Sequence, residues 1–199
     1  MSITAIIPTI AKYITSGFDA LPTSIGITTL FLGSTMMNVS YILFFIGIAL
    51  FLPLIIFLLK NTIGAAPSIK EYLDIGYWFP IMTFICVYII VNAGYLVAQS
   101  PDGSAPDYMI QARRSQAVFA MIYSLAFFGL AWWYNHTIRG ETEVSKAVIS
   151  IVLGAGLSVA WYHILTACGN TKLTDIFGIT SRLFNKPETP SPTVCYTVE

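Results

Sequence analysis

The run YILFFIGIALFLPLIIFLL, residues 41–59, decides the fold of this chain of 199 residues. It contains no charged side chain and is about as long as the roughly 20 apolar residues with which a helix crosses a bilayer. An ionised side chain at the bilayer centre costs roughly 2.5–3.5 kcal/mol, so membrane-spanning helices exclude such groups from their middle. The run therefore predicts a transmembrane helix.

The rest of the chain repeats this pattern. Only 10% of the residues are charged, whereas soluble domains carry about 25%. The charges are confined to short stretches that leave four charge-free runs of 40, 27, 24 and 25 residues, from Ala20 to Leu59, Ile75 to Pro101, Ser115 to Ile138 and Ala147 to Thr171. We predict an all-α fold, a polytopic transmembrane helical bundle of about four spans that occupies residues 38–167.

Local signals place the four spans more closely. The first is expected from Asn38 to Leu59, with a kink at Pro53, because proline removes a helix hydrogen bond. The second is expected from Tyr77 to Ala98. The third helix begins near residue 105, enters the membrane near residue 116 and ends at Trp132, Trp133 and Tyr134, which resemble an interfacial aromatic belt. The fourth is expected from Val144 to Ala167.

The N-terminal segment, residues 1–37, is predicted to be interfacial or re-entrant. Its first part repeats isoleucine at helical spacing, which is typical of a helix lying on a membrane surface. A helix packed on the bundle itself is the alternative, and the pattern leaves both open. Residues 20–37 are apolar but rich in Gly, Thr and Ser, so we expect them to form a short re-entrant or interfacial piece.

The C-terminal region changes character after the fourth span. Residues 168–186 alternate apolar and charged side chains at helical spacing, which predicts an amphipathic surface helix. Residues 187–199 form a Pro-rich extended tail, in which no helix can form. The tail closes with Thr193, Val194, Cys195, Tyr196, Thr197 and Val198, all of high strand propensity. We expect these six residues to dock on the sheet edge of a partner protein.

Topology follows from the Lys and Arg residues on each side of four spans. Six of them fall on the side that holds both termini and four on the other, which favours termini inside the compartment where positive charge accumulates. Arg113 and Arg114 are predicted to act as a lipid-headgroup or topology anchor.

One motif concerns helix packing. Ser150, Gly154 and Ser158 recur every four residues in the fourth span, and such small-residue stripes let transmembrane helices approach closely. Ala120 and Ser124 supply a similar pair in the third span. The stripes predict a compact bundle, and a homo-oligomer explains them equally well.

Residues that carry chemistry are scarce. His136 and His163 are the only histidines, and the chain has no nucleotide-binding, hydrolase or zinc-protease motif. Asn92, inside the second span, is predicted to lock helices together by a hydrogen bond. The formal net charge of +0 gives no basis for nucleic-acid binding. We therefore expect a non-enzyme with no cofactor, no metal site and no nucleic-acid partner, whose partners are the bilayer and neighbouring structural proteins.

In its short length, its plain bundle from Asn38 to Ala167 and its Pro-spaced TVCYTV end, the chain resembles the multi-span inner-membrane or minor capsid proteins of large icosahedral double-stranded DNA viruses. The resemblance implies a structural protein that links a virion's internal membrane to the capsid shell. The sequence alone thus favours an integral, multi-pass membrane anchor. Two alternatives remain: a small channel, facilitator or apolar-ligand sensor, and an accessory subunit of a larger membrane complex.

Overall fold

A computed structural model gives the fold, and it describes residues 12–63, 73–98, 107–169 and 173–176. Within these residues all the regular elements are helices. They are α2 (Leu21–Thr35), α3 (Val39–Ile46), the π-helical turn η1 (Gly47–Phe51), α4 (Leu52–Thr62), α6 (Trp78–Ala98), α7 (Asp107–Thr137) and α8 (Val144–Gly169). Residues 12–19 are also helical. The predicted all-α fold is confirmed.

Four of the helical segments are long and apolar enough to cross a membrane, namely Val39–Thr62, Trp78–Ala98, Ile110–Thr137 and Val144–Cys168. They coincide with the four predicted spans to within a few residues. Charged residues lie close to both ends of the last three spans, whereas the first span has a charge, Lys60, only at its C-terminal end. The chain is therefore a multi-pass helical membrane protein.

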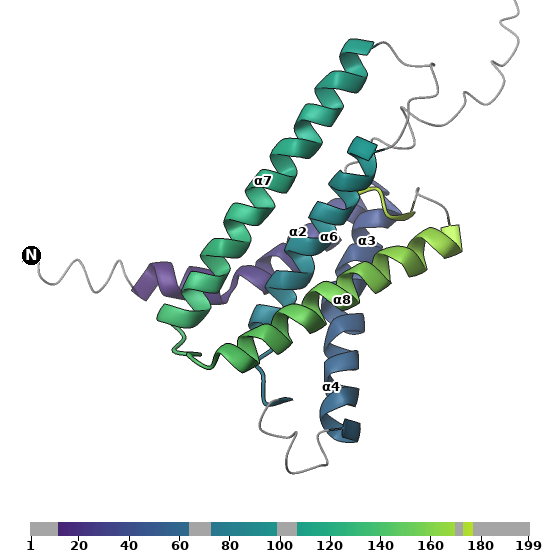
Figure 1. Cartoon of the computed structure of the whole chain (residues 1–199). Helices are drawn as coiled ribbons and strands as arrows, with labels where there is room; N and C mark the ends of the chain where they lie inside the picture. Colours follow the sequence, from purple (N-terminus) through teal and green to yellow (C-terminus); the bar gives the residue numbers. More distant parts are fainter. Residues whose placement is uncertain (1–11, 64–72, 99–106, 170–172, 177–199) are drawn as a thin grey trace, which may run out of the picture.

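The second span, α6, is the central helix of the bundle (Figure 1). It packs against α7 on one side and α8 on the other. Its side chains supply much of the core, including Phe79, Met82, Phe84 and Tyr88, each 1% exposed or less. α7 and α8 pack mainly on α6, so the bundle is organised around this one helix.

The first span contains an irregularity directly before Pro53. Five residues, Gly47–Phe51, form the π-helical turn η1, and the Leu52 amide donates to the Gly47 carbonyl five residues back. A proline ring collides with the carbonyl of the fourth residue before it, and a π-turn is one way in which a helix absorbs such a disruption. The sequence predicted a disruption at Pro53, and the structure places it in the turn that precedes this residue.

The segment before the first span forms a helical hairpin with it. Residues 12–19 continue through Ala20 into α2, since the Ala20 and Ser24 amides bond to carbonyls four residues back. α2 then ends at a tight turn in which Met37 has a positive φ of 50°, and α3 returns along it. The helices touch closely at Gly33, where an added Cβ would lie 2.7 Å from the Ile42 side chain.

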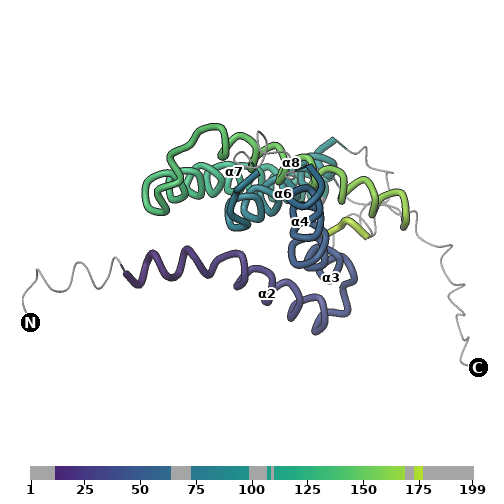
Figure 2. The backbone as a smooth tube through the Cα atoms, turned by 90° about the horizontal axis from the view of Figure 1, so that it is seen from below, coloured from purple at the N-terminus to yellow at the C-terminus, as the bar shows by residue number. Residues whose placement is uncertain are grey.

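This first helical segment runs the length of the bundle. At its start, Trp78 Nε1 donates to the Phe18 carbonyl over 3.1 Å, and the Tyr134 hydroxyl donates to the Thr15 carbonyl over 2.9 Å. At its finish lies the turn into α3, which is at the other end of the spans. Figure 2 shows α2 lying beside the layer formed by α6, α7 and α8. Of the two placements open for the first part of the N-terminal segment, residues 12–19 adopt the one packed on the bundle. α2, for which a short re-entrant or interfacial piece was expected, is a helix of 15 residues that continues from them. Residues 1–11 lie outside the described residues.

Candidate functional site

The small-residue stripe of α8 lies at its contact with α6. Ser150 and Ser158 are 1% and 0% exposed, and the Ser158 hydroxyl donates to the Phe84 carbonyl over 3.0 Å. At Gly154 an added Cβ would lie 2.6 Å from the Pro80 carbonyl oxygen and 2.8 Å from Thr83 Cβ. All three residues therefore face α6 within the same chain, at a distance that larger side chains would prevent.

The corresponding residues of α7 do not meet this stripe. Ser124 is buried but lies beside Cys86 of α6, and α7 likewise packs on α6. On the other face of α8, Gly156 is exposed and has no atom within 4 Å of an added Cβ. The small residues of α8 therefore lie at its contact with α6, and those of α7 belong to a separate contact with the same helix.

Arg113 and Arg114 lie near the start of α7, at the end of the bundle where α6 and α8 finish. Both are half-buried. Arg113 Nη1 donates to the Gln116 side-chain oxygen over 2.9 Å, one turn along the same helix. This position near the end of a span suits either role predicted for the pair, the lipid-headgroup anchor or the topology anchor.

The most unexpected group is a turn after α8 that folds back into the bundle. Thr174, Asp175 and Ile176 are 1%, 5% and 8% exposed. The Asn92 side-chain amide of α6 donates to the Thr174 carbonyl. Asn92 therefore does form a lock, but it holds the chain that follows α8 rather than another span. Residues 173–176, the described part of the predicted surface helix, are a buried turn; the remainder of that helix, apart from the end of α8, lies outside the described residues.

Asp175 is the feature of this region that the sequence did not reveal. It lies close enough to Tyr88 and Tyr162 to act electrostatically on both phenols. The two rings pack edge to face with their centroids 5.9 Å apart. A buried acid in a membrane bundle marks a candidate functional position. The carboxylate was missed because it follows the fourth span in sequence, and only the fold brings it back among the helices.

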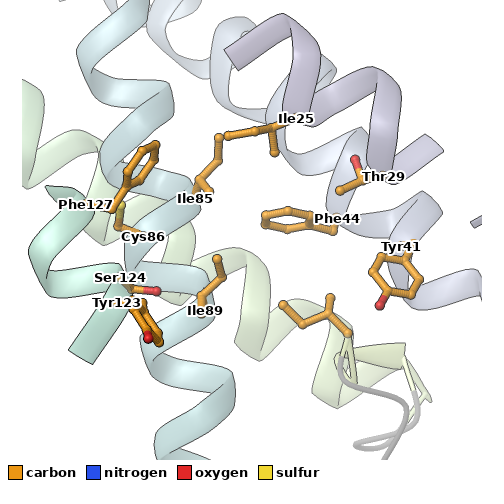
Figure 3. Close-up of a pocket in the computed structure, with 11 residues that line it drawn as sticks. Ile25, Thr29, Tyr41, Phe44, Ile85, Cys86, Ile89, Tyr123, Ser124 and Phe127 are labelled. Atoms are coloured by element: carbon orange, nitrogen blue, oxygen red, sulfur yellow. The ribbon is translucent and has the colours of Figure 1, made fainter. Parts of the chain in front are cut away.

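An apolar cleft of about 540 Å³ lies between α2 and α3 on one side and α6 and α7 on the other (Figure 3). Ile25 and Thr29 of α2 face Ile85, Cys86 and Ile89 of α6 across it. The remaining lining residues are Tyr41, Phe44, Tyr123, Ser124, Phe127 and Ile176. The Thr29 hydroxyl is occupied, since it donates to the Gly26 carbonyl over 2.9 Å. The cleft is therefore suited to hydrocarbon rather than to a polar ligand.

A second, more polar recess lies where residues 15–19 meet the connection between α7 and α8. It measures about 420 Å³ and includes Thr15, Asp19, Tyr134, Arg139 and Glu141. An ion pair of 2.6 Å between Arg139 and Asp19 crosses it. The ion pair connects the first helical segment to the α7–α8 connection. We therefore interpret the recess as part of a structural contact rather than as a binding site.

The described residues hold no group of three or more His, Cys, Asp or Glu side chains that could bind a metal ion. His163 is exposed on α8, with its ring 5.8 Å from that of Tyr162. The six predicted docking residues, Thr193 to Val198, lie outside the described part of the chain.

Comparisons with known proteins give no further guide to the activity. No protein-family description, no curated protein and no solved structure matches this chain.

Proposed function

We propose that this protein is a structural membrane anchor, in which the helical bundle sits in the bilayer and the C-terminal region attaches it to a neighbouring protein layer. The observation that carries the proposal is the buried turn at residues 173–176. Its Ile176 side chain joins the main hydrophobic core, and Asn92 holds its backbone. The chain after α8 is thus held in the interior of the bundle at residues 173–176.

Such an attachment suits a connection that transmits force. A segment that merely trailed from the end of α8 would pass force only to the last helical turn. The buried turn instead passes force to α6, the helix on which α7 and α8 both pack. Pulling Thr174 and Ile176 out of the core exposes an unsatisfied carbonyl and apolar surface, so the connection resists extraction.

The chemistry of the tail supports a protein partner. The Pro-rich spacer in residues 187–199 favours an extended chain, and its last residues have high strand propensity. A strand without a sheet of its own adds to the exposed edge of another protein. The resemblance to inner-membrane and minor capsid proteins of large double-stranded DNA viruses implies that this layer is a capsid shell and that the bilayer is the virion's internal membrane.

The test uses the native source and cross-linking mass spectrometry from Lys172 and Lys186. We expect near-stoichiometric links to a sheet-rich partner, and we expect deletion of residues 187–199 to abolish them while the detergent-extracted bundle keeps its melting temperature. Cross-links that persist after the deletion would overturn docking through the tail.

A pair of substitutions at one position separates strand addition from side-chain recognition. Cys195→Pro removes a backbone donor that a sheet edge requires, whereas Cys195→Ser keeps it. We expect the proline variant to lose the partner and the serine variant to retain it. Tyr196→Pro and Tyr196→Phe form a second pair, because alternate residues of an added strand bond to the partner. Retention by both proline variants would rule out a strand-like mode of docking.

An accessory subunit of a larger membrane complex makes the same use of the tail. The identity of the cross-linked partner separates the two functions: an anchor links to a protein outside the bilayer, and an accessory subunit links to another multi-span protein. The apolar cleft favours a second candidate, an apolar-ligand sensor or facilitator, in which the cleft rather than the tail is the working site.

A further inference from the structure

We propose that the cleft between α2 and α7 is a binding site for one acyl chain of a bilayer lipid, which enters sideways from the membrane. This inference concerns a ligand site and is independent of the anchoring function. It rests on the position of the cleft between the two faces of the bilayer, on the apolar residues around it and on its dimensions.

The depth follows from where the lining residues lie along their helices. Ile85, Cys86 and Ile89 are near the middle of α6 (Trp78–Ala98), and Tyr123 and Ser124 are near the middle of α7 (Asp107–Thr137). The middle of a membrane-spanning helix lies in the hydrocarbon core. α2 shares this depth, because its segment reaches from Trp78 and Tyr134 at one end of the bundle to the α3 turn at the other.

The side of the cleft that faces outward is also apolar. Tyr123 on its rim is 71% exposed, and its neighbour Ile122 on the same helix is 54% exposed. Across the opening, α2 exposes Ile27 (61%) and Phe31 (66%). At this depth such surfaces meet lipid tails, so the contents of the cleft come from the bilayer. Water is excluded because apolar cavities of this kind stay dry.

The dimensions of the cleft favour a single hydrocarbon chain over a protein helix as its occupant. On α6 the lining runs only from Ile85 to Ile89, about one helical turn. A helix from a partner or a second copy is about 10–12 Å thick with its side chains, which is too thick for an opening of this height. A single hydrocarbon chain is thinner and flexible, and a volume of about 540 Å³ falls within the usual range of ligand pockets.

Figure 3 shows how the site can be closed. Ile25 projects from α2 toward Ile85 across the cleft. A bulky side chain at this position fills the volume from one wall. Two residues further along α2, Ile27 points to lipid, with the residue 61% exposed. The two positions therefore offer a matched pair, one inside the cleft and one outside it.

The experiment reconstitutes the full chain in phosphatidylcholine vesicles that contain a small fraction of phosphatidylcholine with a photoreactive diazirine in one acyl chain. After illumination, the labelled residues are mapped by mass spectrometry. We expect label on the cleft-lining residues Cys86, Ile89 and Ser124. Ile25→Trp should lose that label, and Ile27→Trp should keep it.

Two results would overturn the proposal. Label restricted to exposed residues such as Phe119 and Ile122, with none on Cys86 or Ser124, would mean surface lipid only. If neither the cleft residues nor the exposed residues beside the cleft are labelled, and cross-links form between copies, a second chain covers the cleft. Labelling of the unsubstituted protein decides between these results even if Ile25→Trp fails to fold. Loss of the C-terminal tail should leave the labelling unchanged, which keeps this test separate from that of the anchoring function.

Discussion

Gly154 lies at a helix contact that is too close to accept a side chain. An added Cβ there meets the Pro80 backbone carbonyl, which cannot rotate away, at 2.6 Å. We expect Gly154→Leu to lower the free energy of unfolding by about 1–3 kcal/mol, the usual cost of overpacking. Thermal unfolding in detergent measures this, with Gly156→Leu as the control, because a side chain at Gly156 meets open space. Equal midpoints for the two variants would remove the stripe from the α6–α8 contact.

At this scale the sequence was a good guide to packing and a poor one to the cleft and the buried acid. The four-residue spacing of Ser150, Gly154 and Ser158 is local, so it could be read directly from the chain. Asp175 lies in a turn whose Thr174 carbonyl accepts a hydrogen bond from Asn92, 82 positions earlier. Nothing in the local pattern around Asp175 distinguishes a residue that folds back into the core from one that lies on the membrane surface.

The element that decides how the C-terminal region is held is the short turn at residues 173–176. Asn92→Leu removes the donor to Thr174, and membrane hydrogen bonds of this kind contribute about 0.6 kcal/mol on average. We therefore expect little change in the melting temperature but a clear rise in amide hydrogen exchange across the turn. Asn61→Leu is the control, because Asn61 donates within its own helix, to the Phe57 carbonyl. Unchanged exchange in Asn92→Leu would show that apolar packing alone holds the turn.

The limits of the spans were predicted from sequence, including the start of the first span at Asn38, but the helical hairpin that α2 forms with α3 was not. The spans of α6 and α8 begin and end near charged residues, and their predicted limits hold to within a few positions. α2 and α3 share a single charge-free run, and the turn that separates them, Met36 to Asn38, contains neither proline nor glycine. A positive φ at Met37 makes this turn, and methionine gives no warning of it.

For the whole molecule, the path of residues 12–35 changes the expected topology. From Asp19 to Asn38 the chain rises about 28 Å at 1.5 Å per residue, close to the hydrocarbon thickness of about 30 Å. We expect this segment to cross the bilayer, giving five crossings and termini on opposite sides. The Lys and Arg residues then divide five against five, so charge counting no longer favours one orientation.

Cysteine labelling in sealed vesicles tests this topology. In a background without other cysteines, Lys12→Cys and Thr142→Cys are compared with the native, exposed Cys168 by reaction with a membrane-impermeant maleimide. We expect Lys12→Cys and Thr142→Cys to react from one side and Cys168 from the other. If Lys12→Cys and Cys168 instead react from the same side, the segment does not cross.

The uncharged turn between α2 and α3 also bears on how the protein enters the bilayer during synthesis. No ionised side chain lies between Asp19 and Lys60, so α2 and the first span can insert together as a prefolded pair. Carrying their connection across the hydrocarbon then moves no charge, and the step avoids the penalty that normally fixes each loop on its own side. The orientation of the finished protein is consequently decided by the later helices, whose ends and connections carry the charged residues.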